Sequence, residues 1–595
     1  MRSRLHALCK SWRRGDRPMA IRRTNDDAPW RRGPTLALAV ALLSSLLLAA
    51  VSCSSDDDGS GNSDDGATAD PAEIADAQPE WIHLGNDIGN SRAATAETEI
   101  GPDNVAELTP SWELADAKGV TGTPIVADGV VYVGDWTGNV RALDAETGEE
   151  QWATPAGDYY IGGSVALDDE HVFVGAFDAQ VIALDRETGD QEWSTKVDEH
   201  SQAAIFGSPI SVDGMVIVGV ASFELMTSNP APTFRGHVVA LDAETGEERW
   251  NFWTVDEDET GVAGVSVWAT VTVDTERGHV YVPTGNSYGP EPSPRSDAVV
   301  ALDLETGEQL WVTQFTVGDV WTVGNQEGTD SDVGAPPNLF EVDGVDALGV
   351  PDKAGVYHAL DRETGEVLWT AELTEGGLQG GALASSAVAD GAAFVASNRA
   401  SQDADLVALD LDTGDELWRT DVKGHVSGPV TWANGVVYLA NDTGRIVGYS
   451  AEDGSALWTH EVASPAAGGV AVVDGTVYAG WGWWFASPPP EPQGGLIAFR
   501  LGGEAGSSDS DGEGGSAAAS ELGAEVYRER CSSCHGGDGT GGSGPSLVGV
   551  ADRLTLDDHI EIVEEGRDAM PGWDGTLSAE EIEAVVEYQR STLTP

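Results

Sequence analysis

Cysteine, lysine and arginine are the residues that this chain of 595 has in short supply. Its four cysteines are Cys9, Cys53, Cys531 and Cys534, so no disulfide can form within 54–530. Lysine and arginine together number 31, against 100 aspartates and glutamates, and the formal net charge is −69. A field of that sign repels phosphate backbones, and the composition therefore argues against nucleic acid as a partner.

A single apolar run of nearly membrane length, 35–51, follows basic residues at 22–32 and ends just before Cys53. This pattern resembles the signal of an exported lipoprotein, whose cysteine is acylated. The resemblance implies a cleaved segment 1–53, a lipid on Cys53, and a protein anchored to the cell membrane on its extracytoplasmic side. An uncleaved membrane anchor is the alternative, and Met19 is an alternative start.

Two stretches with almost no large apolar residues, 54–78 and 502–520, divide the rest of the chain. Their Asp, Gly and Ser residues cannot bury enough surface to fold, so we expect a disordered acidic linker and a flexible linker. The stretches leave a long segment, 79–501, and a short segment, 521–595, as the folded domains.

The long segment repeats one pattern, A-L-D-x-[E/D]-T-G-x-x-x-W. Each copy is typical of a hairpin: a strand, a turn with glycine, and a second strand that ends in tryptophan. One such hairpin cannot bury its own apolar face, so the repeat predicts an assembly of similar units. Six copies and a degenerate seventh lie at 142–152, 183–193, 240–250, 301–311, 359–369, 408–418 and 448–458.

Each end of the long segment carries half of a unit. The residues LIAF at 496–499 look like a first strand without its tryptophan strand, and Trp112 lies on a tryptophan strand without its first half. If the strand of Trp112 completes the last unit, the units close into a ring of eight. The sequence thus predicts an all-β, eight-bladed β-propeller with one tryptophan packed at each blade boundary.

The short segment contains C-S-S-C-H at 531–535, the attachment motif of c-type haem. Cys531 and Cys534 would bond covalently to haem c, and His535 would be one axial ligand of its iron. Met570 is the candidate for the second axial ligand, because a thioether suits haem iron. The alternative role of Met570 is ordinary core packing.

Helices are expected at 521–530, before this motif, and at 578–592, near the end of the chain. The segment 521–595 resembles a monohaem class I cytochrome c over its whole length. This resemblance implies a small all-α domain that carries single electrons.

Between its repeats, the propeller resembles the alcohol dehydrogenases that depend on pyrroloquinoline quinone (PQQ), over about residues 80–500. The resemblance rests on four residues at matching offsets from the repeats: Glu224, Trp268, Asn286 and Lys353. It implies that Trp268 supports the flat face of PQQ and that Lys353 contacts its oxygens. It also implies that Glu224, beside PQQ, and Asn286 bind a metal ion, either Ca²⁺ or a lanthanide.

These residue types suit the chemistry of the cofactor. PQQ is a flat ortho-quinone with three carboxylates, so it needs an aromatic support, cations, and a hard metal with oxygen ligands. A carboxylate must then take the alcohol proton while hydride moves to the quinone. Propellers of assembly factors use similar repeats with no quinone, so the residues between the repeats carry the functional prediction.

Two registers are open for the catalytic carboxylate. In the first, at 320–322, the aspartate of the family is lost. In the second, at 329–333, Asp330 is the base and a metal neighbour, and Asp332 is an extra metal ligand, as in relatives that use lanthanides. The second register has the longer downstream match, and we favour it.

The chain departs from the commonest members of this family, because it has no adjacent cysteines to cap the quinone. The corresponding stretch, 155–165, offers Tyr159 and Tyr160 and lacks the arginine that normally follows. These features, the haem domain and WIHLGNDIGNSR at 81–92 make the polyvinyl alcohol dehydrogenase branch the nearest resemblance. The loop 481–492 is either an aromatic binding rim or a proline-rich cover.

The combined expectation is an exported quinohaemoprotein that oxidises an alcohol substrate, and the polyvinyl alcohol dehydrogenase resemblance implies a secondary alcohol on a polymer. Electrons would pass from PQQ to haem c and on to an external acceptor, which is a cytochrome, an oxidase or a quinone. A PQQ dehydrogenase for a small alcohol or sugar is the first alternative. A non-catalytic propeller scaffold with an electron-carrying tail is the second.

Overall fold

The computed structural model describes residues 80–591 apart from several gaps. The gaps are 158–159, 228–230, 326–327, 378–379, 483–492, 503–525, 532–534, 536–544, 551–552, 555–558, 561, 564–565, 568–569, 572–576 and 578. The following predictions lie outside the described residues: the signal segment with Cys53, the linker 54–78, nearly all of the linker 502–520, Tyr159, most of the loop 481–492, Cys534 and the side chain of Met570. Within the described part, no helix combines the length and the apolar character needed to cross a membrane.

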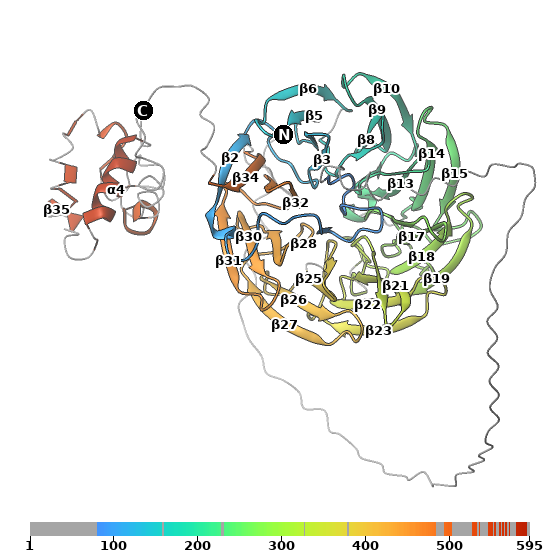
Figure 1. Ribbon diagram of the computed structural model, residues 1–595. Coiled ribbons are helices and arrows are strands. Elements are labelled where there is room, and N and C mark those ends of the chain that lie inside the picture. The colour runs from blue at the N-terminus through green and yellow to red at the C-terminus, as the bar shows by residue number, and fades with distance from the viewer. Residues whose placement is uncertain are drawn as a thin grey trace, which may run out of the picture. The chain divides into compact units, whose positions relative to one another are not determined.

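Eight four-stranded antiparallel sheets surround a central axis, and the chain passes from blade to blade around the ring (Figure 1). This confirms the eight-bladed β-propeller. Blades 1 and 2 comprise β3 (Ile125–Ala127), β4 (Val130–Gly134), β5 (Asn139–Asp144), β6 (Glu150–Pro155), β7 (Ala166–Leu167), β8 (His171–Gly175), β9 (Gln180–Asp185) and β10 (Gln191–Lys196). Blades 3 and 4 comprise β12 (Ile210–Val212), β13 (Met215–Ser222), β14 (His237–Asp242), β15 (Glu248–Trp253), β16 (Thr272–Asp274), β17 (His279–Pro283), β18 (Ala298–Asp303) and β19 (Gln309–Gln314).

The second half of the ring is built in the same way. Blades 5 and 6 comprise β20 (Asn338–Val342), β21 (Val345–Pro351), β22 (Val356–Asp361), β23 (Val367–Glu372), β24 (Ala387–Ala389), β25 (Ala392–Asn398), β26 (Ala404–Asp410) and β27 (Glu416–Val422). Blade 7 and the three C-terminal strands of blade 8 comprise β28 (Thr431–Ala433), β29 (Val436–Ala440), β30 (Arg445–Ser450), β31 (Ala456–Glu461), β32 (Val470–Val473), β33 (Thr476–Trp481) and β34 (Gly495–Leu501). Three short elements join this frame: β11 (Ala203–Ala204) on β13, and the 3₁₀ turns η2 (Val105–Glu107) and η3 (Phe223–Met226).

The ring closes between its first and last parts. The strand β2 (Leu108–Leu114) pairs antiparallel with β34 and forms the outer edge of blade 8. This pairing confirms that the strand of Trp112 completes the last unit. A closed ring leaves no blade with an unpaired neighbour at either end.

The Asp, Thr and Gly of the repeated pattern form one hydrogen-bonded turn. In blade 1, Asp144 Oδ1 accepts hydrogen bonds from the N–H and the hydroxyl of Thr147, both at 2.8 Å. The N–H of Gly148 donates to Asp144 O, also at 2.8 Å, with a φ of 73° that favours glycine. The letters D-x-x-T-G therefore form the turn between the third and fourth strands of a blade.

The tryptophan at the end of the pattern docks on the corresponding turn of the next blade. Trp112 packs so closely on Gly148 that an added Cβ would lie 2.6 Å from the indole ring. Eight indole N–H groups donate to backbone oxygens of the following blade, and we call this series the tryptophan ring. The pairs are Trp112 with Ala145 (3.1 Å), Trp152 with Arg186 (3.3 Å), Trp193 with Ala243 (2.9 Å), Trp250 with Leu304 (2.9 Å), Trp311 with Arg362 (3.3 Å), Trp369 with Leu411 (3.0 Å), Trp418 with Ala451 (2.9 Å) and Trp458 with Leu108 (3.2 Å).

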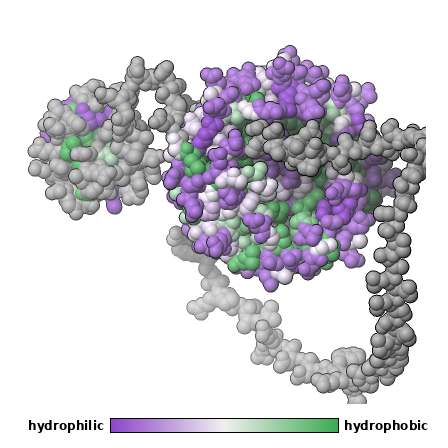
Figure 2. Space-filling model, viewed as in Figure 1, coloured by the Kyte–Doolittle hydropathy of each residue, from purple (hydrophilic) through white to green (hydrophobic). Residues whose placement is uncertain are grey.

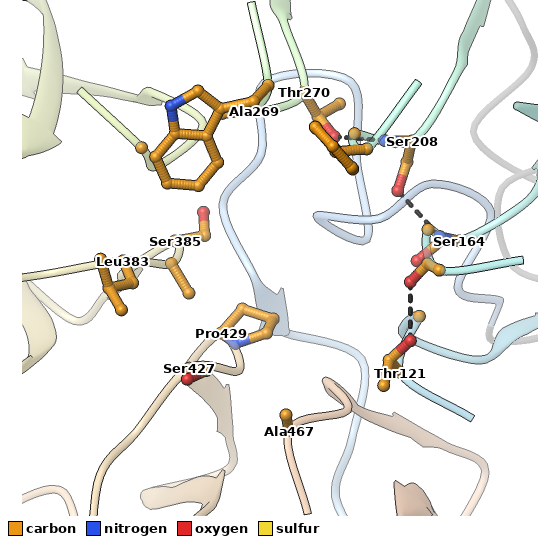
Figure 3. Close-up of a pocket in the computed structure, with 18 of the residues that line it drawn as sticks. Thr121, Ser164, Ser208, Ala269, Thr270, Leu383, Ser385, Ser427, Pro429 and Ala467 are labelled. Atoms are coloured by element: carbon orange, nitrogen blue, oxygen red, sulfur yellow. Dashed lines mark hydrogen bonds between the residues drawn. The ribbon is translucent and has the colours of Figure 1, made fainter. Parts of the chain in front are cut away.

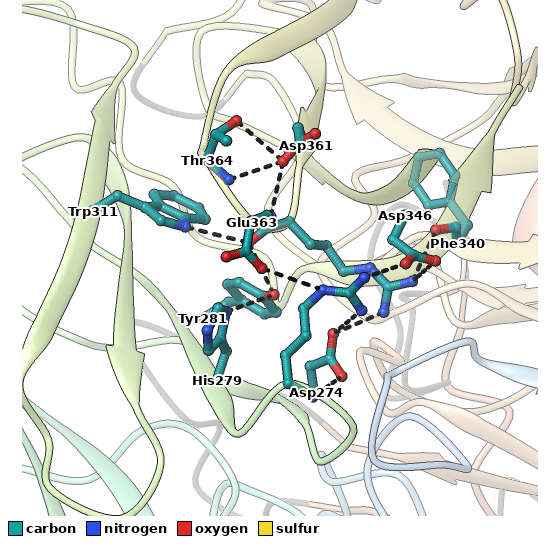
Figure 4. A network of polar contacts seen from close by, with 11 residues as sticks. Asp274, His279, Tyr281, Trp311, Phe340, Asp346, Asp361, Glu363 and Thr364 are labelled. Atoms are coloured by element: carbon teal, nitrogen blue, oxygen red, sulfur yellow. Dashed lines mark hydrogen bonds and ion pairs between the residues drawn. The ribbon is translucent and has the colours of Figure 1, made fainter. Parts of the chain in front are cut away.

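Ion pairs reinforce the joint between blades 4 and 5 (Figure 4). Arg362 of blade 5 lies 3.0 Å from Asp274 of blade 4 and 2.9 Å from Asp346 of its own blade. Arg277 of blade 4 contacts the same two carboxylates. Asp274 is buried, so these charges are screened less than those on the hydrophilic rim that Figure 2 shows around the propeller.

The segment 81–94, which we call the N-terminal strap, runs across the centre of the ring (Figure 1). It ends in β1 (Ala93–Ala94), which pairs parallel with the innermost strand of blade 7. Its backbone bonds to the innermost strands of five blades, through Trp81 to Val126, Ile88 to Val273, Gly89 to Leu339, Ser91 to Val388 and Arg92 to Trp432. The strap therefore closes one end of the axial channel.

The C-terminal domain is described in part. The helix α4 (Ala579–Ser591) agrees with the helix expected at 578–592, and η4 (Tyr527–Cys531) is a π-helical turn that leads into the haem motif. The two helices enclose a small core with Val526, Tyr527, Val563 and Val585. A short pairing of β35 (Gly566–Arg567) with β36 (Met570–Pro571) was not predicted.

We predict that Gly307→Ala destabilises the propeller by about 1–3 kcal/mol more than Gly278→Ala in urea unfolding. Both glycines have positive φ, 69° and 66°, so both variants carry the same backbone strain. A Cβ at Gly307 would lie 2.6 Å from Trp250, whereas nothing lies within 4 Å of one at Gly278. Equal effects of the two substitutions would contradict a structural role for tryptophan docking.

Candidate functional site

An axial cavity of about 700 Å³ lies where the loops of the blades meet. One series of lining residues comes one or two positions after the second strand of a blade: Trp136, Phe177, Phe223, Lys353 and Asp442. A second series comes two positions before a first strand: Thr123, Ser164, Ser208, Thr270, Pro336, Ser385 and Pro429. The repeated blade therefore presents two fixed positions to the axis, whatever residues occupy them.

Hydroxyl groups line one side of the cavity, where Figure 3 shows Thr121, Ser164, Ser208 and Thr270 in succession. Ser208 Oγ accepts from Ser164 N (2.9 Å), and Thr270 Oγ1 accepts from Ser208 N (2.8 Å). Thr121 Oγ1 donates to the backbone oxygen of Gly162 at 2.9 Å. These bonds tie the loops of blades 1 to 4 together and fix the width of the cavity on this side.

An aromatic wall forms another side of the cavity, with rings from Trp136, Tyr160, Phe177, Phe206 and Phe223. The Tyr160 ring stacks on Trp136 at 4.7 Å between centroids and meets Phe177 edge-on, also at 4.7 Å. Phe206 and Phe223 continue the series at a centroid distance of 4.9 Å. Tyr160, noted as a substitute for the missing cysteines, is thus one of five contacting rings.

Trp268 lines the same cavity and is seated on two glycines. A Cβ at Gly334 would lie 2.1 Å from Trp268 Cη2, and one at Gly285 would lie 3.2 Å from its Nε1. Any larger residue at Gly334 would displace the indole. The sequence therefore holds one flat aromatic face in a fixed place, as support of a planar ring system requires.

Lys353 lines the cavity and meets Asp330 and Asp332, and all three side chains are buried. Lys353 Nζ lies 2.7 Å from Asp330 Oδ2 and 3.3 Å from Asp332 Oδ2. Asp332 Oδ1 accepts from Asn286 N at 2.7 Å, and Asp332 O accepts from Lys353 N at 3.0 Å. The structure thus brings four of the predicted site residues together.

Buried carboxylates outnumber cations in this region, because Asp319 and Asp297 also lie near the cluster of Lys353, Asp330 and Asp332. Burial, followed by repulsion from Asp332, raises the pKa of Asp330 to about 7. The same two causes raise the pKa of Asp297 to about 9. Burial opposes the charge of Lys353, but attraction by Asp332 and Asp330 outweighs it and raises the Lys353 pKa.

Glu224 is buried at the start of η3. Its Oε2 accepts hydrogen bonds from Thr233 N (2.9 Å) and Phe234 N (2.8 Å), which belong to the insertion before Arg235. Phe234 O in turn accepts from Gly264 N at 2.8 Å, and the next residue, Val265, donates to Asn286 O at 2.9 Å. A continuous backbone network therefore links Glu224 to Asn286.

The residues fit a hard metal ion by the chemistry of their oxygens and by their charge. Asp330 Oδ1 is buried and accepts no hydrogen bond from any described residue, and the neighbouring acids have one cation between them. Among the described residues, no three His, Cys, Asp or Glu side chains converge as a ready metal centre. Lys353 stands between the two aspartates instead, so the metal roles of Glu224, Asn286, Asp330 and Asp332 stay predictions.

The two registers for the catalytic carboxylate occupy different places. Thr322 bonds within its own turn, to the backbone of Asn325, and supplies no carboxylate. The neighbouring Trp321 O accepts from Asn286 Nδ2 at 2.6 Å and so supports the site. The second register brings two acids, Asp330 and Asp332, to Lys353, whereas residues 320–322 of the first register bring none.

The described part of the haem motif suits an iron ligand. Cys531 is buried. His535 Nδ1 donates to Pro545 O at 2.8 Å, which fixes the tautomer and leaves the Nε2 lone pair for the metal. Sequence reasoning did not find Pro545, because nothing local marks a carbonyl ten residues away as the partner of His535.

Models of known protein families match both folded domains. Residues 81–375 match the model for the glucose/ethanol/alcohol dehydrogenase β-propeller domain that carries the name PQQ. The propeller belongs to the PQQ-dependent dehydrogenase family. Residues 352–506 also match the model for outer membrane protein assembly factor BamB, and residues 518–588 match cytochrome c oxidase, cbb3-type, subunit III. The last match confirms a cytochrome c domain.

Two individual relatives show how similar the chain is to known dehydrogenases. The chain is 29% identical over 352 residues to polyvinylalcohol dehydrogenase of Sphingopyxis sp. (strain 113P3), which covers 52% of this chain and 47% of the relative. It is 28% identical over 353 residues to quinohemoprotein alcohol dehydrogenase ADH-IIG of Pseudomonas putida, with 51% and 47% covered. The chain therefore spans about half the length of the curated relatives it matches.

Solved structures show the same fold. Quinohemoprotein alcohol dehydrogenase ADHIIG from Pseudomonas putida HK5 superposes with a TM-score of 0.63 at 22% identity, over 88% of this chain and 97% of that one. A europium-containing methanol dehydrogenase gives 0.60 at 18% identity, over 72% and 99%.

We predict that Lys353→Met lowers the free energy of unfolding by about 3 kcal/mol in the presence of a chelator. Breaking a buried ion pair costs about 3–5 kcal/mol, and protonation of Asp330 relieves part of that cost. The measurement is urea unfolding followed by tryptophan fluorescence. Lys423→Met is the control, since Lys423 is 65% exposed and its pair with Asp403 contributes little. A Lys353 variant as stable as the control would refute the charge argument.

Proposed function

We propose that the chain is a quinohaemoprotein alcohol dehydrogenase that oxidises an alcohol at the propeller axis and passes the electrons through haem c. The observation that carries the proposal is the buried pair of Asp330 and Lys353 at a cavity bordered by Trp268. A carboxylate, a cation and an aromatic face around one space are what alcohol oxidation by a planar quinone needs. The family of the propeller and the cytochrome match support the same reading.

Asp330 is placed to act as the general base. Its pKa of about 7, raised by burial and by Asp332, lets it hold a proton taken from an alcohol at neutral pH. Lys353 would stabilise the negative charge that develops on the oxygen atoms of the cofactor as it accepts hydride. Trp268, seated on Gly334, would keep the ring system parallel to its own face. When bound, PQQ would supply the carbonyl carbon that accepts hydride.

A metal ion would share this site. Asp330, Asp332, Asn286 and Glu224 are the residues that would hold Ca²⁺ or a lanthanide, and their oxygens are of the kind these ions prefer. The excess of buried acids over cations favours an ion of high charge. Asp332, beyond Asp330 and Glu224, would add a third carboxylate to the ligand set.

The aromatic wall favours an alcohol with hydrocarbon next to its hydroxyl group. The five rings can bury carbon but offer few hydrogen bonds, so a sugar would leave hydroxyls without polar partners on this side of the cavity. A secondary alcohol, including one on a polymer such as polyvinyl alcohol, fits this surface best. The similarity to polyvinylalcohol dehydrogenase supports this choice over a small polar alcohol or a sugar.

The location proposed for the protein rests on the N-terminal segment 1–53. The basic stretch, the apolar run and Cys53 support export and a lipid anchor on the extracytoplasmic side of the cell membrane. In that place the haem would pass electrons to an external cytochrome, oxidase or quinone.

A scaffold without catalysis is the second candidate, because residues 352–506 match the BamB model. A scaffold would gain nothing from several buried acids and one lysine at an axial cavity, since burying such charges costs stability. The site therefore favours the dehydrogenase.

The test is alcohol-dependent reduction of haem c in the full chain loaded with PQQ and Ca²⁺. We expect Asp330→Asn to slow this reduction by about 10²–10⁴-fold, the contribution of a general base, with an unchanged haem spectrum. Thr322→Ala, in the alternative register, should change the rate little. A chain that binds PQQ yet reduces no haem with any alcohol would defeat the proposal, and equal rates for the two variants would remove Asp330 as the base.

A further inference from the structure

Arg92 of the N-terminal strap is a fully buried arginine that has no acidic partner among the described residues. Its side chain is 0% exposed. Its guanidinium donates to Val430 O (2.7 Å), Val470 O (3.2 Å) and Leu84 O, and to the hydroxyls of Thr431 (2.7 Å) and Thr123 (3.2 Å). All five acceptors are neutral. The guanidinium also lies over the ring of Trp81, with its carbon 5.3 Å from the ring centroid.

Such a charge is costly to bury. Neutral acceptors replace the hydrogen bonds of water but do not cancel the charge, and a buried cation without a counter-ion destabilises a protein by several kcal/mol. Burial accordingly lowers the pKa of Arg92 to about 9, and no carboxylate acts against that effect. Arg141, also buried, lies 2.6 Å from Asp135. In the same propeller, the charge of that arginine is therefore balanced by a carboxylate.

Arg92 lies directly behind the surface of the axial cavity. Two of its acceptors belong to cavity-lining residues, Leu84 and Thr123. Thr123 Oγ1 receives its hydrogen bond from Arg92, and its own O–H donates to no acceptor among the described residues. The hydroxyl can therefore donate to an anion in the cavity, and the positive charge behind it strengthens that bond.

A cofactor with three carboxylates needs positive charge near this cavity. Lys353 is the one lysine or arginine among the described lining residues, and it is already shared by Asp330 and Asp332. A cofactor with three carboxylates brings further negative charge. The sequence also lacks the arginine that follows the paired cysteines in the commonest relatives, so no residue from that loop supplies the charge.

We propose that Arg92, acting through the hydroxyl of Thr123, is the positioning residue that holds a carboxylate of the quinone cofactor at the strap end of the cavity. This inference rests on the proposed function. It assigns the strap a part in cofactor binding in addition to closing the channel. The bound carboxylate in turn supplies the counter-ion that Arg92 lacks within the described protein.

A purely structural arginine would fasten the strap to blades 7 and 8 and would be indifferent to the charge of the ligand. The two roles are separated by comparing PQQ with its trimethyl ester, which has the same rings and no carboxylate charge. Only an arginine that holds a carboxylate discriminates between them.

The experiment measures binding of PQQ and of the trimethyl ester to the full haem-loaded chain in Ca²⁺, by tryptophan quenching. Arg92→Gln should weaken PQQ by about tenfold or more, because a hydrogen bond to a charged group contributes about 1.5–3 kcal/mol and 1.4 kcal/mol is tenfold. Its affinity for the ester should stay unchanged. Arg92→Lys should keep most of the preference for PQQ, and Thr123→Val should lose part of it while leaving the strap in place.

Arg500→Gln is the matched control, since Arg500 also donates to backbone oxygens, of Ala145 and Glu146, but lies away from the cavity. Equal loss of both ligands in the Arg92 and Thr123 variants, or no loss of PQQ, would overturn the inference and leave the proposed function intact. If Arg92→Gln fails to fold, Thr123→Val decides the question alone. A wild-type chain that does not bind PQQ would overturn the proposed function itself.

Discussion

Docking of each tryptophan on the next blade is the constraint from which the rest of the propeller follows. Seven indoles pack on the turn glycine of the next blade, and the eighth, Trp458, bonds to Leu108 of blade 8, where the ring closes. In the closed ring, the second strands of five blades end beside the axial cavity. A side chain just after such a strand, such as Trp136 or Lys353, then reaches the cavity regardless of its chemistry.

Charge at the axis is the second constraint. Asp274, at the joint between blades 4 and 5, meets two arginines, whereas the acids around Lys353 outnumber their one cation, and Arg92 on the strap meets no acid within the described part of the chain. The excess of acids lies beside the cavity-lining Lys353, and the excess of positive charge lies behind the cavity-lining Leu84 and Thr123. A metal cation and a polyanionic quinone together would compensate both excesses, which ties these buried charges to the proposed cofactors.

The sequence predicted those parts of the structure that depend on local rules. The repeat and its half units specified eight blades and the strand of Trp112, because each copy of the pattern contains both the turn residues and the tryptophan that docks. Offsets from the repeats likewise located Trp268 and Lys353. The aromatic wall and Arg92 were not identified, since their partners lie in other blades. Listing the residue after each second strand would have found Phe177 and Phe223; no local signal marks Arg92.

The most direct measurement is a crystal structure of the chain loaded with PQQ and a lanthanide, with the metal located by its anomalous scattering. The account predicts the quinone rings stacked on Trp268, the metal peak bound by Asp330, Asp332 and Glu224, and Lys353 turned toward the quinone oxygens. A metal peak away from these carboxylates, or a quinone bound outside the axial cavity, would contradict it.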